Sequence, residues 1–188
     1  IYRPGTENII FEPYADLSGI NFGNLDLSGL DLTGANLSNS SLGYANLSGT
    51  NLTDANLNDI YLNGTDLSNA NLTGATLHTA NLQSANLQDA NLTGADLSLA
   101  NVKYAQLYSA NLTDATLVGA DFTQTYLNDA DLTGVIIDPS HSSFSTIFER
   151  TNFTNATFDT NFNLSGYDLI DVNFSGATLV GADLTGAN

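Results

Sequence analysis

Residues 70–84 read ANLTGATLHTANLQS, which is three copies of a five-residue unit that repeats almost without a break through the chain. From Leu17 to Ile137 every fifth residue is large and apolar, giving 25 consecutive positions of which 21 are Leu. The residue two places earlier is Ala in 16 of these 25 units, and the residue directly before is usually Asn or Asp. The repeating unit is therefore Ala, Asn or Asp, Leu, and two variable residues.

A period of five fits neither common secondary structure, because helices bury a face about every 3.6 residues and strands about every two. It predicts a coil that turns a corner at each unit, with the apolar residue and the small residue inside. Four such sides close a square coil of roughly 20 residues, and a short fixed period is the signature of a solenoid.

The repeat resembles that of the pentapeptide-repeat family, and the resemblance covers residues 15–188. It implies an all-β fold, a right-handed quadrilateral parallel β-helix with about four pentapeptides in each coil. The resemblance says little about activity, because members of the family do different things on the same rod.

Two segments depart from the repeat. Residues 1–14 are out of register and include an apolar cluster that ends at Phe11, so we predict an N-terminal cap segment there. The remaining 15–188 are predicted to form the β-helix, with a phase-breaking loop at 138–147 whose Asp-Pro pair and Ser run favour a turn. We expect this loop to protrude from the rod.

After the loop the repeat resumes one residue late at Phe148, and it slips by one more residue between Phe158 and Leu164. The units in this part of the chain carry Phe where the earlier units carry Leu. We expect these rings to fill a locally wider core.

Composition limits the function. The net charge is −17, from 20 acidic and three basic residues, which disfavours naked nucleic acid and anionic membranes as partners and favours basic proteins. No Cys is present and no apolar run is long enough for a membrane span, so neither disulfides nor membrane insertion is expected. The scarcity of Lys and Arg and the first residue, Ile1, favour an exported or lumenal location over the cytoplasm. The last repeat breaks off within a unit, which predicts an end-to-end homodimer or continuation in a longer chain.

No set of residues suggests catalysis. The two histidines, His78 and His141, are far apart, and no nucleophile has a base at a recognisable spacing. Asp129 and Asp131 are the closest acidic pair on the regular rod, but calcium requires six or more converging oxygens. We therefore predict no catalytic residues, no metal site and no cofactor.

Outward-facing aromatic residues are the first candidates for a contact surface. Tyr104, Tyr108 and Tyr126 fall around one edge of the predicted rod, beside Lys103. Tyr is enriched where proteins meet. The alternative is that these Tyr side chains only cover the backbone of the wall. His141, in the predicted loop, is a further candidate contact residue.

One side of the predicted coil is more uniform than the others. Residues one coil apart stack at roughly 4.8 Å, and on this side the residue after each Leu is always Thr, next to a column of Asn or Asp. The members of this ladder are Thr33, Thr53, Thr73, Thr93, Thr113 and Thr133.

Three functions remain open. The first is a non-enzymatic rod that binds or scaffolds a partner protein, since repeat rods commonly work by offering extended surfaces. The second comes from the resemblance: some pentapeptide-repeat proteins mimic DNA and bind type II topoisomerase, and the charge of −17 is compatible with this. Those members, however, have more Phe, frequent Cys and a C-terminal dimerising helix. The third is ice or polysaccharide binding by the Thr and Asn face.

Overall fold

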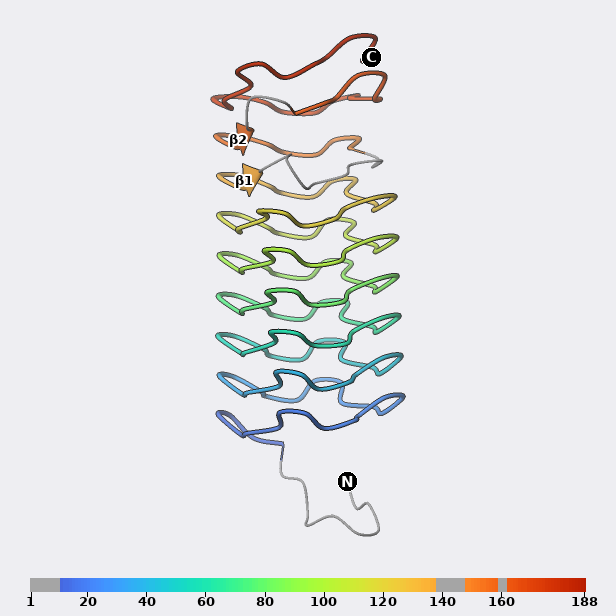
Figure 1. Cartoon of the computed structure of the whole chain (residues 1–188), viewed down its shortest axis with the longest axis vertical. Helices are drawn as coiled ribbons and strands as arrows, with labels where there is room; N and C mark the ends of the chain where they lie inside the picture. Colours follow the sequence, from blue (N-terminus) through green and yellow to red (C-terminus); the bar gives the residue numbers. More distant parts are fainter. Residues whose placement is uncertain (1–10, 138–147, 159–161) are drawn as a thin grey trace.

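The computed structural model describes residues 11–137, 148–158 and 162–188. The coils stack along one axis into a rod, with early residues at one end and late residues at the other (Figure 1). The predicted fold, a right-handed parallel β-helix of the pentapeptide-repeat type, is confirmed. The described residues include no helix, and therefore none that could cross a membrane.

The backbone of each side pairs with the equivalent side of the next coil. Asn71, for example, bridges Asn51 on one side and Asn91 on the other, both in parallel. The Leu72 amide donates to the Asn91 carbonyl at 2.6 Å, and the Asn91 amide donates back to the Ala70 carbonyl at 2.9 Å. Pairing between coils therefore satisfies the backbone groups of every wall.

A tight turn ends each side. In the unit that begins at Ala70, the Ala75 amide donates to the Leu72 carbonyl at 3.0 Å, and Gly74 between them has a φ of 66°. Positive φ at this position is typical of a type II turn and explains why Gly, Asn and Asp are common there. This repeated corner accounts for the five-residue period.

Within residues 11–137, 148–158 and 162–188 only one short sheet arises, because most sides contribute a single bridging residue. Strand β1, Ile136–Ile137, pairs in parallel with strand β2, Thr157–Phe158. The stacking interval is 20 residues in the regular rod, as for Asn36 over Asp16. It becomes 21 for Asn152 over Asp131. This longer interval confirms the predicted one-residue slip, although the loop predicted at 138–147 lies outside the described residues.

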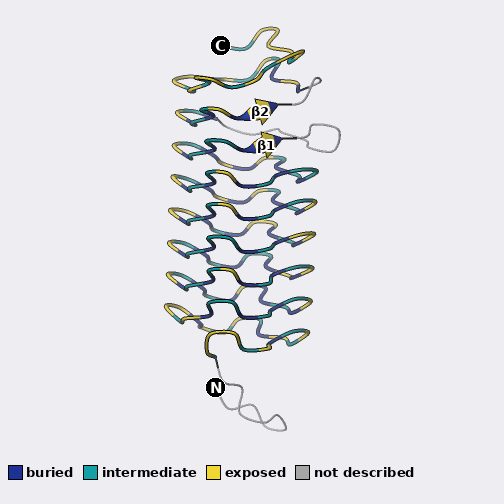
Figure 2. Cartoon of the chain, turned by 90° about the vertical axis from the view of Figure 1, so that its left-hand side faces the viewer, coloured by how far each residue is buried: buried dark blue, intermediate teal, exposed yellow. Residues whose placement is uncertain are grey.

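The core is a narrow column of Leu and Ala side chains. Leu72, Ala75 and Leu92 are all 0% exposed. Buried residues line the walls while the exposed ones gather at the corners (Figure 2). Occasional Ser and Thr at the inward small position donate to backbone carbonyls, as Thr65 does to Leu42 at 2.7 Å, so they carry no unpaired hydroxyl into the core.

Aromatic rings replace Leu in the later coils, as the sequence predicts. Phe153 packs against Phe158 at a centroid distance of 5.2 Å and against Phe174 at 5.4 Å. Phe162 occupies the position that is Ala in most units, and its ring lies 4.7 Å from that of Phe158. At the other end Phe11, from the predicted cap at 1–14, packs on Phe22 at 5.4 Å. Residues 1–10 of the predicted cap lie outside the described residues, so the cap stays a prediction.

The inward and outward positions predict opposite responses to the same substitution. Leu92→Asp places a carboxylate in the apolar column and should cost more than about 4 kcal/mol in the free energy of unfolding. Thr93→Asp places it on the half-exposed wall, where it removes one hydrogen bond, and should cost about 1 kcal/mol. Urea unfolding of the two variants measures the difference, and equal losses would contradict the assignment of the two faces.

Candidate interaction surfaces

The Thr ladder predicted from sequence is built from two kinds of hydrogen bond. Asn71 Oδ1 accepts from the Thr73 amide at 3.2 Å and from the Thr73 hydroxyl at 2.6 Å. The Asn91 side-chain amide, one coil further on, then donates to the same hydroxyl at 3.0 Å. The second type of bond joins residues 18 apart, because the residue after Leu in one coil lies beside the residue before Leu in the next.

The same pair of contacts recurs along this wall. Amide donation to a Thr hydroxyl is found for Asn51 to Thr33, Asn71 to Thr53, Asn152 to Thr133 and Asn173 to Thr154. Thr154 thus extends the ladder beyond the residues identified from sequence, because the one-residue slip hides it from a strict 20-residue alignment.

The ladder leaves its Thr hydroxyls little freedom to order external water. A hydroxyl has one proton to donate, and in Thr33, Thr53, Thr73, Thr93 and Thr113 that proton goes to the Asn or Asp two residues earlier, at 2.6 to 2.7 Å. The ladder face is therefore internally hydrogen-bonded, and its first role is to hold the coils together.

The amide columns have a direction. Side-chain amides donate toward the N-terminal neighbour, so Asn36 donates to Asp16 at 3.0 Å, Asn46 to Asp26 at 3.1 Å and Asn51 to Asp31 at 3.2 Å. A carboxylate can accept but cannot donate. Asp therefore suits the first coil, where the column needs only an acceptor.

Hydrogen bonds lower the pKa of several exposed carboxylates. The pKa of Asp16 lies below its usual value chiefly because the Ser18 hydroxyl donates to it at 2.8 Å, and the pKa of Asp31 is lowered in the same way by Thr33. The pKa of Asp129 is lowered by the guanidinium of Arg150, whose Nε lies 2.5 Å from the carboxylate. These groups therefore bind protons less readily in the folded chain than in the unfolded one.

Arg150 is a structural residue that the sequence analysis did not single out. Its Nη2 donates to Asp129 Oδ2 at 2.8 Å across neighbouring coils, and its Nη1 contacts Glu149. Asp129 is thereby committed to an ion pair, and Asp131 accepts from Thr133 at 2.5 Å. Among the described residues no group of three or more potential metal ligands occurs.

The tyrosine edge, defined as Tyr104, Tyr108 and Tyr126 with Lys103, lies on two adjoining walls. The rings of Tyr108 and Tyr126 stack at a centroid distance of 5.5 Å and an interplanar angle of 27°. Tyr104 is 45% exposed at the corner between the walls. Lys103 Nζ lies 2.9 Å from Asp121 Oδ2, so its charge is neutralised on the rod. His141, the last candidate contact residue, lies outside the described residues.

Both tyrosine-edge contacts follow the 18-residue diagonal of the Thr ladder. Tyr126 is 18 residues after Tyr108, and Asp121 is 18 after Lys103, so each pair replaces an Asn–Thr contact. Burial raises the pKa of Tyr108 further above its ordinary value, and a phenol is already neutral at pH 7. The edge is thus a mainly uncharged aromatic surface on a strongly acidic rod.

The direction of the columns predicts an asymmetry between Asn and Asp. Asn71→Asp removes the amide that donates to Thr53 at 2.9 Å and places a carboxylate beside Asn51 Oδ1. We expect a loss of about 1–2 kcal/mol. The matched change Asp31→Asn keeps the acceptor and should cost less than about 0.5 kcal/mol. Urea denaturation at pH 7 tests both, and similar costs would argue against a directional ladder.

The lowered pKa values predict loss of stability in acid. Groups whose folded-state pKa is depressed contribute stability above their unfolded pKa of about 4, and this is lost as the pH falls through the folded value. The melting temperature should therefore fall between about pH 5 and pH 3. Replacing Asp16, Asp26 and Asp31 by Asn keeps the acceptors but removes the titration, so the triple variant should show a shallower fall. A melting temperature that rises on acidification would show that relief of charge repulsion outweighs these hydrogen bonds.

Comparison with known proteins agrees with the geometry. The profile of the family described as pentapeptide repeats (8 copies) matches six overlapping or successive segments, at residues 15–54, 50–89, 60–98, 75–114, 105–138 and 160–188. Among curated proteins none matches the sequence significantly.

Several solved structures resemble the chain. HetL, a pentapeptide repeat protein involved in heterocyst differentiation regulation from the cyanobacterium Nostoc sp. strain PCC 7120, is 30% identical, with a TM-score of 0.70 over 98% of this chain and 90% of that one. QnrB1, a plasmid-mediated fluoroquinolone resistance protein, is 22% identical, with a TM-score of 0.56 over 96% of this chain and 85% of that one, and shows the shared fold alone. By its family match and its likeness to HetL, the chain belongs to the pentapeptide-repeat family.

Proposed function

We propose that this protein is a non-enzymatic rod that binds a partner protein through the tyrosine edge. The observation that carries the proposal is the stacked pair of Tyr108 and Tyr126 beside the exposed Tyr104. Tyr offers a large amphipathic contact area and is enriched among the residues that dominate binding energy. On the Thr-ladder wall, by contrast, the corresponding side chains are consumed in amide and hydroxyl contacts between coils.

The chemistry of the rest of the rod supports a binding role. The side chains that could act as acids or bases on the described walls are isolated or paired in structural contacts, such as Asp129 with Arg150. HetL, the 30% identical relative, is involved in the regulation of differentiation. Regulation by a rigid rod is most simply achieved by presenting a surface to another protein.

The charge favours a partner with a basic rim. The rod carries −17, while the tyrosine edge itself is close to neutral because Lys103 pairs with Asp121. A partner with an apolar centre and surrounding Lys or Arg would match both features, and its association would be faster at low salt.

The two alternatives gain less support. A DNA mimic needs closely repeated negative charge, but in the columns Asp16 and Asp26 are followed by Asn rather than by another Asp. An ice- or polysaccharide-binding Thr face needs available hydroxyls, and those of the ladder donate to neighbouring Asn and Asp side chains.

Replacing Tyr104, Tyr108 and Tyr126 together by Ser tests the proposal. We expect the triple variant to lose at least about tenfold in affinity for the partner, which corresponds to about 1.4 kcal/mol. The partner is first identified by cross-linking to the wild-type rod in extracts of the native source, and its affinity is then measured with purified components. The melting temperature should fall by only a few degrees, because the main loss is the Tyr108–Tyr126 stack, worth about 0.5–1.5 kcal/mol.

The matched control removes exposed tyrosines elsewhere. Tyr14 and Tyr61 are 78% and 56% exposed, and their replacement by Ser should leave the affinity unchanged. Equal binding by the triple variant and the wild type would eliminate the tyrosine edge as the contact surface.

A further inference from the structure

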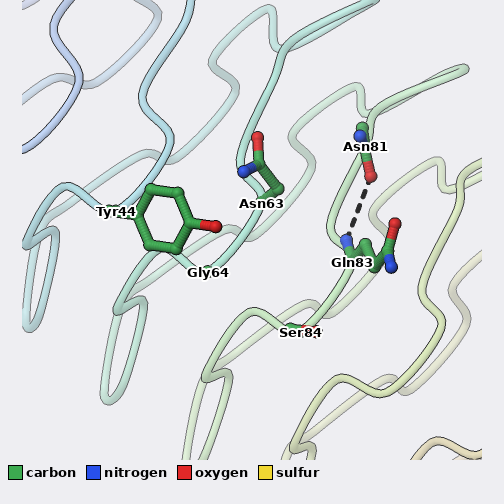
Figure 3. Close-up of a pocket in the computed structure, with 6 residues that line it drawn as sticks. All are labelled: Tyr44, Asn63, Gly64, Asn81, Gln83 and Ser84. Carbon is green, nitrogen blue, oxygen red and sulfur yellow. Dashed lines mark hydrogen bonds between the residues drawn. The ribbon is translucent and has the colours of Figure 1, made fainter.

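A hollow of about 390 Å³ opens on the wall whose corner carries Tyr44, Gly64 and Ser84 in successive coils. It is lined by Tyr44, Asn63, Gly64, Asn81, Gln83 and Ser84, which come from three successive coils (Figure 3). The Tyr44 ring forms one side, Asn63 stands beside it, and Gln83 lies on the following coil next to Asn81. This hollow lies on a different wall from the Thr ladder.

Glycine at position 64 makes room for the aromatic side. Tyr44 occupies the corner position with a φ of 58°, and its ring lies across Gly64 in the next coil. A Cβ atom at Gly64 would lie 2.6 Å from Tyr44 Cε1, a distance that real side chains do not adopt. Tyr44 is nevertheless 68% exposed, so its ring is held in place while remaining open to solvent.

The hollow contains polar groups that the rod does not use. On the Thr-ladder wall, side-chain amides and hydroxyls bond to one another between coils. In the part of the chain that the structure describes, no hydrogen bond is made by the side chains of Asn63, Gln83 and Ser84 or by the Tyr44 hydroxyl. Asn81 differs, because its Oδ1 accepts from the Gln83 amide at 3.1 Å and from Asn101 at 3.3 Å. Asn81 thus fixes the backbone that carries the free Gln83 side chain.

The hollow is also uncharged, although the chain as a whole carries −17. An ionic ligand would find no counter-charge among the lining residues. The groups present are an exposed aromatic ring, two hydroxyls and three primary amides, of which that of Asn81 is already used in contacts within the rod. Each amide places a donor and an acceptor side by side, which matches two neighbouring hydroxyls of a sugar, and the ring offers an apolar face to the C–H groups of a pyranose.

We propose that this hollow is a binding site for a neutral saccharide, with Tyr44 as the stacking platform and the side chains of Asn63 and Gln83 as the hydroxyl-reading groups. The amides lie one coil apart, roughly 4.8 Å, so one bound sugar unit reaches both. A protein partner fits less well, because a small polar hollow with one aromatic residue lacks the apolar centre that protein contacts need.

The hollow adjoins the tyrosine edge but uses different side chains. Tyr44 lies three coils, roughly 14 Å, from Tyr104 in the same corner column, whereas the Ser84 amide at the other end of the hollow donates to the Lys103 carbonyl at 2.8 Å. Loss of saccharide binding and loss of partner binding would therefore follow from different substitutions.

Titration of the full 15N-labelled chain with cellohexaose, maltohexaose and laminarihexaose tests the proposal by NMR. We expect at least one of these neutral probes to bind with a Kd of about 1–10 mM, a range typical of a shallow open site. The side-chain amide signals of Asn63 and Gln83 should shift most, whereas those of Asn71 and Asn91 in the Thr ladder should not move. Absence of binding by all three probes at about 10 mM would overturn the proposal.

Matched variants locate the binding. Tyr44→Ser should weaken it at least about tenfold, and Gln83→Ala about threefold or more. Tyr14→Ser is the control. The Tyr14 ring lies over Gly34 as Tyr44 lies over Gly64, since a Cβ atom placed at Gly34 would be 2.5 Å from the Tyr14 ring. Tyr14 does not line the hollow. Binding that survives both Tyr44→Ser and Gln83→Ala, or that falls equally with Tyr14→Ser, would overturn the assignment. If Tyr44→Ser loses its native spectrum, Gln83→Ala alone decides.

Discussion

The vertical alignment of coils is the constraint on which the rest of the structure depends. Backbone groups of each wall find their partners in the coils above and below, as Leu72 does with Asn91 and Asn91 with Ala70. Because every wall residue lies beside the equivalent residue of the next coil, the side chain that it meets can be read from the sequence one coil away. The acidic composition is tolerated for this reason: carboxylates such as Asp16 and Asp31 meet the donating amides of Asn36 and Asn51 instead of another charge.

Surface side chains make two kinds of contact between coils, and contact between residues 20 apart is only the first. The second contact joins residues 18 apart, and it links Thr53 with Asn71 through a hydrogen bond of 2.9 Å. The same diagonal links Lys103 with Asp121 and Tyr108 with Tyr126. The Thr ladder and the tyrosine edge therefore share the same contact between residues 18 apart, and they differ only in which residues make it. Where Asn and Thr are replaced by Tyr108 and Tyr126, the diagonal contact becomes a stack of two partly exposed rings, which is the basis of the proposed contact surface.

The sequence predicts the fold and the core well, because burial follows the five-residue period directly. Leu92 is inside, and the shift of the stacking interval is already visible in the spacing of Phe148 from the preceding repeats. The sequence predicts surfaces less well. The contact between residues 18 apart depends on how neighbouring coils are offset, and the five-residue period does not specify this offset. The Tyr108–Tyr126 stack was therefore not foreseen, and neither was the ion pair of Arg150 with Asp129. The hollow beside Tyr44 was missed because its aromatic side depends on a glycine 20 residues later, whose importance appears only when the ring is seen to cover it.

Departures from the ladder carry the most information about function. The residue before each Leu is normally Asn or Asp, and replacing it gives up a hydrogen bond between coils worth about 1 kcal/mol. Tyr occupies this position at Tyr61 and Tyr126. Tyr126 recovers part of the loss by stacking on Tyr108 at 5.5 Å, and such aromatic pairs contribute about 0.5–1.5 kcal/mol. Tyr61 remains 56% exposed, with no ring of the described residues stacked on it. Because local rules are broken mainly where function requires it, a protein partner should be sought on the wall that carries Tyr126 rather than on the uniform Thr wall. Tyr61 pairs with Asn81 on the wall of the hollow, which is the separate candidate site.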